Sequence, residues 1–148
     1  MTDIKLTDFA HIIRMPTRWG DLDMLGHVNN AKFFTYDESA RLSYFDEWMQ
    51  KNPRFWKEDG MILANIGCDF IAQLHHPANL SIGLRIARMG RSSMNTLGAM
   101  FDGDRLVAVT RGVIVWFDYA SQKTQPIPAP VRDWIRNREV IKPEEQPS

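Results

Sequence analysis

The hydrophobic pattern of this sequence changes its period once, from the spacing of a helix to the spacing of strands. Between residues 33 and 49, large apolar side chains recur every three or four positions and so share one face of a helix. Between residues 61 and 117 they recur every second position, as they do in strands. A chain this small cannot cover one helix with separate layers. The pattern therefore predicts an α+β fold in which an antiparallel sheet curls around a long central helix.

The predicted helix has clear start and stop signals. Asn29 or Asn30 suits the N-cap, because an asparagine side chain accepts a hydrogen bond from a free amide of the first turn. The pair Asn52-Pro53 ends the helix. The apolar face is wide, so we expect a mostly buried helix. Its members are Phe33, Phe34, Tyr36, Ala40, Tyr44, Phe45, Trp48 and Met49.

About five strands are predicted. Phe9 is expected on the same face of the first strand as Ile13, and Asp102-Gly103 marks a tight turn between two later strands. The last strand is apolar on both faces, as expected of a central strand. Several strands exceed the usual length of about five or six residues, which fits a strongly curved sheet. The predicted strands are residues 9–15, 62–74, 80–86, 94–101 and 106–117.

The length of 148 residues predicts one domain that spans the chain. A short helix is expected near residues 131–135, and residues 143–148 are expected to form a disordered tail. Eighteen basic and eighteen acidic side chains cancel, so the charge favours neither a nucleic-acid nor a membrane partner. The chain has no apolar run near the roughly 20 residues of a membrane helix and no apolar signal-peptide core, so we expect a cytoplasmic protein.

A loop-like stretch from Arg18 to Asn30 precedes the helix and carries the most specific motif of the chain. Its last ten residues read D-L-D-M-L-G-H-V-N-N. They resemble the signature D-x-D-x-x-G-H-V-N-N of hotdog-fold acyl-CoA thioesterases of the 4-hydroxybenzoyl-CoA thioesterase type, in which the motif leads into the central helix. The likeness covers about residues 8–135. Weaker similarities to that family are Glu38-Ser39-Ala40-Arg41, His76-Pro77-Ala78 and Gly90-Arg91-Ser92-Ser93.

The resemblance implies a hotdog fold and the hydrolysis of an acyl-CoA to a free carboxylic acid and coenzyme A. No cofactor is implied, because coenzyme A is part of the substrate. The family also implies a homodimer or homotetramer with active sites at the subunit interface. By resemblance, Asp23 carries the chemistry and the backbone N–H of Asn30 stabilises the oxyanion. Substrate contacts are expected at His27, Asn29, Arg91 and Ser92.

The residues themselves suit this chemistry. A helix N-terminus presents unpaired N–H groups and a partial positive charge, and it polarises a carbonyl without any side chain. Asp23 lies in the loop just before that terminus. Its carboxylate can attack the thioester carbonyl to form a mixed anhydride, or act as general base to a water molecule. The sequence leaves both routes open.

Other residues have structural interpretations that compete with functional ones. Asp21 is expected to hold a turn or to pair with Arg18. Glu38 is the rival catalytic carboxylate, although pairing with Arg41 or contact with a strand is favoured for it. Cys68, the single cysteine, faces the core by its alternation and is expected to be inert packing.

Two histidines and three arginines are also candidates for binding a metal ion or a ligand. His75 and His76 are adjacent in an extended turn, so their side chains should diverge, and we expect no metal site. Arg85, Arg88 and Arg91 cluster around the end of a strand, where they would meet the phosphates of coenzyme A or simply be solvated.

Two alternative functions stay open at the level of the sequence. A hotdog hydratase or dehydratase pairs an acidic residue with a histidine, and one branch carries D-x-N-P-x-H. Here Asp23 and His27 lie four residues apart rather than five, and the Asn-Pro pair is absent. The other alternative is a non-catalytic acyl-CoA-binding protein with the same fold. The sequence identifies neither the acyl group nor whether a carrier protein replaces coenzyme A.

Overall fold

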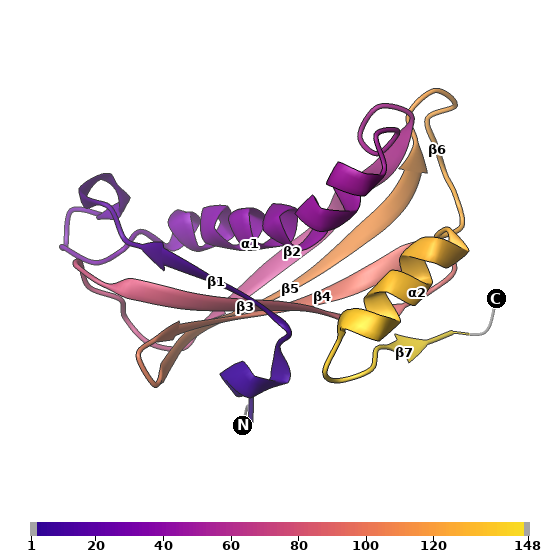
Figure 1. The fold of residues 1–148 in the computed structure, drawn as a ribbon. Helices are drawn as coiled ribbons and strands as arrows, with labels where there is room; N and C mark the ends of the chain where they lie inside the picture. The colour runs from indigo at the N-terminus through magenta and orange to yellow at the C-terminus, as the bar shows by residue number, and fades with distance from the viewer. Residues whose placement is uncertain (1–2, 147–148) are drawn as a thin grey trace.

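In the computed structural model, which describes residues 3–146, one long helix lies along the concave face of a curved antiparallel sheet (Figure 1). The helix is α1 (Asn30–Lys51), and the strands follow the order β1-β3-β4-β5-β2 across the sheet. This arrangement confirms the predicted α+β hotdog fold. The five long strands are β1 (His11–Pro16), β2 (Asp59–Phe70), β3 (Asn79–Met89), β4 (Ser93–Asp102) and β5 (Arg105–Asp118).

Shorter elements complete the architecture. The predicted terminal helix is present as α2 (Ala129–Arg138), and a two-residue strand, β6 (Lys123–Thr124), extends the hairpin of β5. Two 3-10 turns, Leu6–Asp8 and Trp19–Asp21, flank β1. Within residues 3–146, none of the helices has the length and apolar character that a membrane crossing requires.

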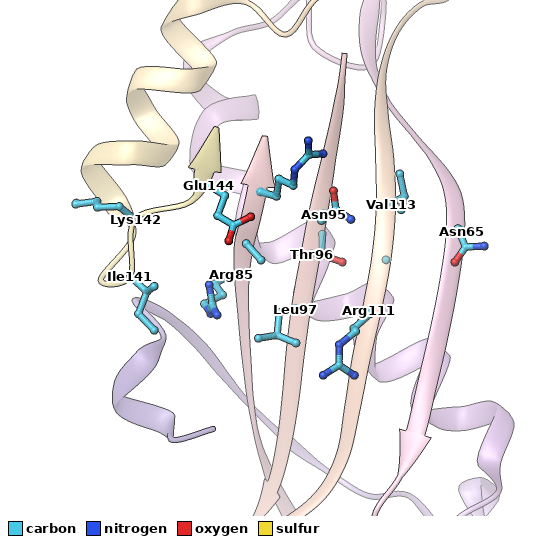
Figure 2. A pocket seen from close by; sticks show the side chains of 13 residues that line it. Asn65, Arg85, Asn95, Thr96, Leu97, Arg111, Val113, Ile141, Lys142 and Glu144 are labelled. Atoms are coloured by element: carbon cyan, nitrogen blue, oxygen red, sulfur yellow. The ribbon is translucent and has the colours of Figure 1, made fainter. Parts of the chain in front are cut away.

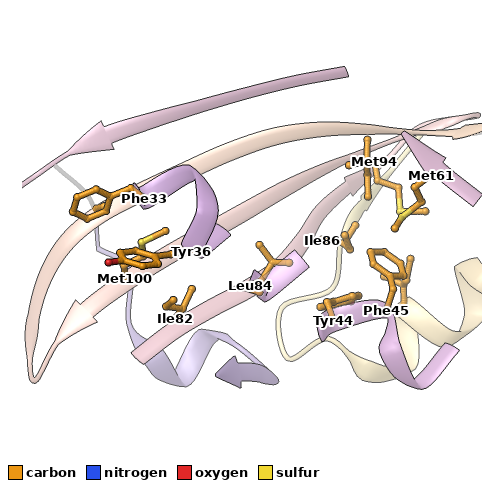
Figure 3. Packing of buried hydrophobic residues seen from close by; sticks show 14 of the residues in the cluster. Phe33, Tyr36, Tyr44, Phe45, Met61, Ile82, Leu84, Ile86, Met94 and Met100 are labelled. Atoms are coloured by element: carbon orange, nitrogen blue, oxygen red, sulfur yellow. The ribbon is translucent and has the colours of Figure 1, made fainter. Parts of the chain in front are cut away.

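The core lies between α1 and the inner face of the sheet (Figure 3). Tyr36, Tyr44 and Phe45 of the helix are at most 3% exposed and pack over Ile82 and Leu84 of β3, which are fully buried. Burying one such side chain contributes about 1.5–3 kcal/mol, so this layer is the main source of stability. The helical period therefore identified most of the buried apolar face of α1, but Phe34 is 37% exposed, and the expectation of a mostly buried helix is wrong because one face of α1 is open to solvent in the single chain.

Strand β2 departs from the uninterrupted alternation that the sequence suggested. A bulge between Leu63 and Asn65 shifts its register against β5. Before the bulge Met61 faces the core, opposite Trp116, whereas after it Ile66 does so, opposite Gly112. The extra residue thus turns the strand over, which a period-two pattern cannot reveal. The strand also ends earlier than predicted, at Phe70.

Phe9 is not part of the first strand, contrary to the prediction. Strand β1 begins at His11, and Phe9 instead packs against the outer face of the sheet with Ala99 and Phe101. Gly83 makes this possible, because a Cβ at that position would lie 2.5 Å from a carbon of the Phe9 ring. The absence of a side chain at Gly83 thus leaves the space in which Phe9 packs on the outer face of the sheet.

The C-terminal segment is ordered where we expected a disordered tail. Glu144–Glu145 form strand β7, which pairs in parallel with Arg88 and Met89 of β3. Arg136 of α2 makes an ion pair with Glu145 at 2.5 Å. Hydrogen bonding to a free sheet edge fixes residues 143–146, although their composition is that of a loop. The last two residues of the predicted tail, 147–148, lie outside the described part of the chain.

Glu139, directly after α2, fastens this segment to the sheet. Its buried carboxylate accepts hydrogen bonds of 2.7 Å from the amide of Ile86 and from the hydroxyl of Tyr44. Ile86 lies between the part of β3 that pairs with β1 and the part that pairs with β7. The carboxylate therefore replaces a missing strand partner. Burial raises the pKa of Glu139.

A buried ion pair lies between α1 and the sheet. Asp37 accepts a 2.5 Å bond from Arg41 one turn later and a 2.6 Å bond from the hydroxyl of Thr110 on β5. Gly98 gives this pair room, since a Cβ there would approach the Thr110 hydroxyl to 2.2 Å. Arg41 therefore pairs with Asp37, and the expected pairing with Glu38 is wrong because Glu38 points to solvent.

Candidate functional site

The loop before α1 is anchored by Asp21. This carboxylate is 7% exposed and accepts hydrogen bonds from the Tyr36 hydroxyl at 2.6 Å and from the Arg18 amide at 3.0 Å. Burial disfavours its charged form, but these two hydrogen bonds prevail and lower the pKa of Asp21. The interpretation of Asp21 as a turn residue is confirmed, and its side chain is buried and does not line the hollow described below.

Asp23 closes a tight turn of the same loop. Its Oδ1 atom accepts the amides of Leu25 at 2.9 Å and His27 at 3.1 Å, and its own amide donates to the carbonyl of His27 at 2.8 Å. Gly26 provides the turn with a positive φ of 79°. The carboxylate is therefore held in place by backbone groups. Within residues 3–146, no hydrogen bond engages its second oxygen, Oδ2, and the side chain is exposed.

The N-terminus of α1 follows directly. Asn29 is the N-cap, as predicted, and its side-chain oxygen accepts the amide of Ala31 at 3.0 Å. The amide of Asn29 donates to the carbonyl of Asp21 at 2.8 Å. In the described chain, the amide of Asn30 has no such acceptor. A free N–H at the positive end of a 22-residue helix is suited to bind a developing negative charge.

These groups share a hollow of about 350 Å³. Asp23, His27 and Asn30 supply its polar wall, while Phe33 of α1 and Phe70 of β2 supply apolar walls. The two phenylalanine rings pack edge to face, with their centroids 5.5 Å apart. The hollow thus combines a fixed carboxylate, a free amide and an apolar surface. Asn29 is absent from its lining and acts as a helix cap.

The far wall of the hollow is residues 71–74, which the sequence did not single out. The amide of Val28 donates to the carbonyl of Leu74 at 2.9 Å, which ties this segment to the loop. Gln73 adds a polar side chain there. The sequence pointed to this segment only through Gln73, a polar residue within an apolar alternation. Because β2 ends at Phe70, Gln73 lies outside the strand and lines the hollow.

The two adjacent histidines diverge, as predicted. The ring of His75 packs edge-on against His27 with centroids 4.8 Å apart, whereas Nδ1 of His76 lies 2.8 Å from the hydroxyl of Thr17. Neither is near a third ligand, since within residues 3–146 no three His, Cys, Asp or Glu side chains gather in a way that would hold a metal ion. Packing against His75 gives His27 a defined position beside Asp23.

Arg91 and Ser92 lie far from this hollow within one chain. The carbonyl of Ser92 accepts the amide of Trp116 near the end of β5, whereas Phe70 beside the hollow pairs with Ala108 near the start of that strand. Arg91 instead lies next to Ile127, before α2. A single chain therefore does not bring these two predicted substrate residues to Asp23.

Two other candidates fall outside the hollow. Glu38 is exposed on α1 and is absent from the lining. Cys68 is partly buried on β2, and burial together with the nearby carboxylates of Asp69 and Asp37 raises the pKa of its thiol to about 11. A thiol with such a pKa stays protonated near neutral pH and is a poor nucleophile, which agrees with the packing role expected of it.

Comparison with known proteins identifies the family. The sequence model of the thioesterase-like superfamily matches residues 17–135. The uncharacterized protein YsmA of Bacillus subtilis is 30% identical over 100 residues, which cover 66% of this chain and 67% of YsmA.

Solved structures agree with the sequence match. A thioesterase from Thermus thermophilus, solved in complex with coenzyme A and zinc, is 30% identical with a TM-score of 0.77, over 89% of this chain and 96% of that one. The PA5185 protein of Pseudomonas aeruginosa is 28% identical with a TM-score of 0.78, over 90% and 94% of the two chains. The chain therefore belongs to the thioesterase-like superfamily of thioester hydrolases and has their hotdog fold.

Proposed function

We propose that this protein hydrolyses an acyl-CoA thioester to a free carboxylic acid and coenzyme A in the hollow of Asp23. The observation that carries the proposal is the shared position of three features. Within residues 3–146, two amides hold the Asp23 carboxylate and leave its Oδ2 atom free, and the amide of Asn30, which has no acceptor there, lines the same hollow of about 350 Å³. The family match and the relative solved with coenzyme A support the same conclusion.

In this proposal the carbonyl oxygen of the thioester accepts a hydrogen bond from the N–H of Asn30. As the carbonyl carbon becomes tetrahedral, negative charge grows on that oxygen, and the N-terminal dipole of α1 stabilises it. One preorganised donor of this kind typically contributes about 10²–10³-fold to the rate. Because the donor is a backbone group, a side-chain substitution of Asn30 leaves it in place.

Asp23 supplies the other half of the chemistry. Its Oδ2 atom takes a proton from a water molecule that attacks the carbonyl, or attacks the carbonyl itself and forms a mixed anhydride that water then cleaves. In either route the C–S bond breaks and coenzyme A leaves as a thiolate. The thiolate is a good leaving group, so strong acid assistance is unnecessary. His27, held against His75, positions the loop and faces the substrate.

The active unit in this proposal is a dimer formed through β2. This strand ends the sheet, and the nearby side chains of Phe34, Leu42, Leu63 and Phe70 are between 37% and 44% exposed. A long apolar edge strand favours pairing with another strand. A second copy of the chain related by a two-fold axis would extend the sheet through its own β2 and cover these side chains.

Such a dimer also gives Arg91 and Ser92 a role. Antiparallel pairing brings the Phe70 end of one β2 next to the Asp59 end of the other. The Asp59 end lies alongside the end of β5, which pairs with the beginning of β4, just after Ser92. Each hollow would then have Arg91 and Ser92 of the second copy at its end of the combined sheet, where they bind the phosphates of coenzyme A.

The substitution Leu63→Asp tests the dimer. A charge in the middle of the paired edge would be desolvated without a partner, so we expect the dimer to become a monomer and turnover to fall with it. Light scattering measures the mass. Val140→Asp is the control, because Val140 is 59% exposed away from β2 and its variant should keep the wild-type mass. A wild-type protein that is monomeric would contradict the proposal.

The function itself is tested by turnover on a panel of thioesters. Purified protein is incubated with short, medium, long and aromatic acyl-CoAs, and release of free thiol is measured. We expect hydrolysis of at least one member. Binding of acyl-CoA without thiol release would indicate a non-catalytic binding protein, and water addition to an enoyl-CoA would indicate a hydratase.

A further inference from the structure

A second hollow, of about 590 Å³, lies on the outer face of the sheet, on the side opposite α1 (Figure 2). Strand register explains which side chains reach it. One rung across the sheet joins Arg85, Leu97 and Arg111, and the next joins Arg88, Asn95 and Val113. Phe9 covers only the part of the outer face around Ala99 and Phe101, so it does not cover these two rows of residues. The C-terminal segment with Ile141 forms a wall of the hollow on the β3 side (Figure 2).

The guanidinium of Arg85 is the unusual group of this hollow. Its Nε atom is shielded from solvent and has no hydrogen-bond partner in the described chain. A buried donor left unpaired costs about 1–3 kcal/mol, and more for a charged group. Arg85 also acts electrostatically on the carboxylate of Glu139, whose Oε2 atom accepts from Ile86 and Tyr44 and whose Oε1 atom is buried without a hydrogen-bond partner in the described chain. Within residues 3–146, the Nε atom of Arg85 is therefore a charged donor that no hydrogen bond satisfies.

The neighbouring charges leave the hollow positive on balance. Arg88 donates to Gln146 at 3.0 Å, which is a neutral acceptor. Arg111 adds little to this charge, because it pairs with Asp69 at 2.9 Å. Glu144 is the acidic side chain of the lining, and it lies opposite Arg88 in the register of β7 against β3. Lys142 adds a further positive charge, since its ammonium donates only to the neutral carbonyls of Arg136 and Glu139.

We propose that this hollow binds a phosphate-bearing ligand of nucleotide size, with its phosphates on Arg85 and Arg88. Its volume is within the range of about 300–1,000 Å³ that is typical of small-molecule sites. Leu97, Val113 and Ile141 offer an apolar surface for a flat ring. The amides of Asn65 and Asn95 offer donors and acceptors to its edges. Arginine binds phosphate through paired N–H groups, which suits the unpaired donor of Arg85.

The site is separate from the hollow of Asp23. The two lie on opposite faces of the sheet, because Arg85 and Leu97 point outward while Phe33 and Phe70 face the inner side. The sequence grouped Arg85 and Arg88 with Arg91, whereas the structure puts only the first two in this hollow. The ligand is either a free nucleotide or the nucleotide part of the coenzyme A substrate, since both carry the same groups; in the second case Arg85 and Arg88, rather than Arg91 and Ser92, hold the phosphates of the substrate.

The test is calorimetric titration of the full-length protein with ADP, with pyrophosphate and with coenzyme A. We expect ADP to bind the wild type, and Arg85→Gln to weaken it by about 10- to 100-fold, the equivalent of one charged hydrogen bond. Asn95→Asp, which adds a negative charge to the lining, should weaken it as well. Arg54→Gln is the control, because Arg54 is exposed and pairs with Glu58 elsewhere on the surface.

Two kinetic measurements distinguish the sources of the nucleotide. If the substrate itself fills the hollow, Arg85→Gln raises the KM for an acyl-CoA but not for an acyl-pantetheine, which has no nucleotide. If a free nucleotide fills it, both KM values stay unchanged while ADP binding is still lost. These measurements require the proposed activity, but the titration does not, so failure of one is separable from failure of the other.

Three results would overturn the proposal. One is that neither ADP, pyrophosphate nor coenzyme A binds the wild type at millimolar concentration. Another is that Arg85→Gln and Asn95→Asp bind ADP as the wild type does. The third is a change of oligomeric mass in Arg85→Gln by light scattering, which would show that the hollow is an interface between copies of the chain.

Discussion

Asp23→Asn is expected to lower kcat by about 10²–10⁴-fold on the best thioester of the panel, the contribution typical of a positioned general base. The amide oxygen of asparagine still accepts the hydrogen bonds of Leu25 and His27, so the loop keeps its turn. The amide group is neither a base nor a nucleophile. The loss should therefore appear in kcat, while the melting temperature stays near that of the wild type.

Glu38→Gln is the matched control for this result. Glu38 is the rival carboxylate of α1, but it is exposed and outside the hollow. We expect its variant to retain wild-type turnover. The opposite outcome, in which Glu38→Gln loses activity and Asp23→Asn retains it, would reverse the assignment of the catalytic carboxylate.

Asp37→Ala is expected to lower the free energy of unfolding by about 3–5 kcal/mol, because it leaves Arg41 charged and buried without its partner. Arg41 is 8% exposed and has no other ion pair in the described chain. The hydroxyl of Thr110 loses its acceptor at the same time. Denaturation in urea, followed by circular dichroism, measures the change.

The control for this substitution is an exposed pair on the same helix. Lys51 and Glu47 have the same spacing at 3.4 Å, but their side chains are 74% and 56% exposed. Lys51→Ala should therefore change the stability by less than about 1 kcal/mol, and it is preferred to a change of Glu47, which also pairs with Arg138 at 3.9 Å. The double substitution Asp37→Ala with Arg41→Met should recover part of the loss, since it removes the unpaired charge. A stability of Asp37→Ala equal to that of the wild type would refute the argument.

The fold was predictable because the helix and the strands of this chain are long and strongly patterned. The spacing of apolar residues from Phe33 to Met49 is that of a helix, and the alternation after Met61 is that of strands. The predictions of strand register and of strand bounds failed where a single residue alters the local structure. Examples are the bulge after Leu63, which has no sequence signal, and Gly83, whose missing side chain admits Phe9.

The candidate site was predictable in part. The motif placed Asp23 just before Asn30, and because such a short loop cannot separate them, local sequence brought both to one hollow. Residues 71–74 on its far wall were missed, since their position depends on where β2 ends and how the next turn folds back. Arg91 and Ser92 were expected at the same place, but one chain keeps them at the other end of the sheet.

The sequence by itself therefore determined the elements of this protein and the short-range geometry of its carboxylate and helix N-terminus, because both follow from contacts between neighbours in the chain. Only the tertiary structure decided which charges are paired, as with Arg41 and Asp37, and which side chains share a hollow, as with Arg85 and Arg88. Those outcomes depend on strand register and on the few ångströms of space between layers, which distant parts of the chain fix together.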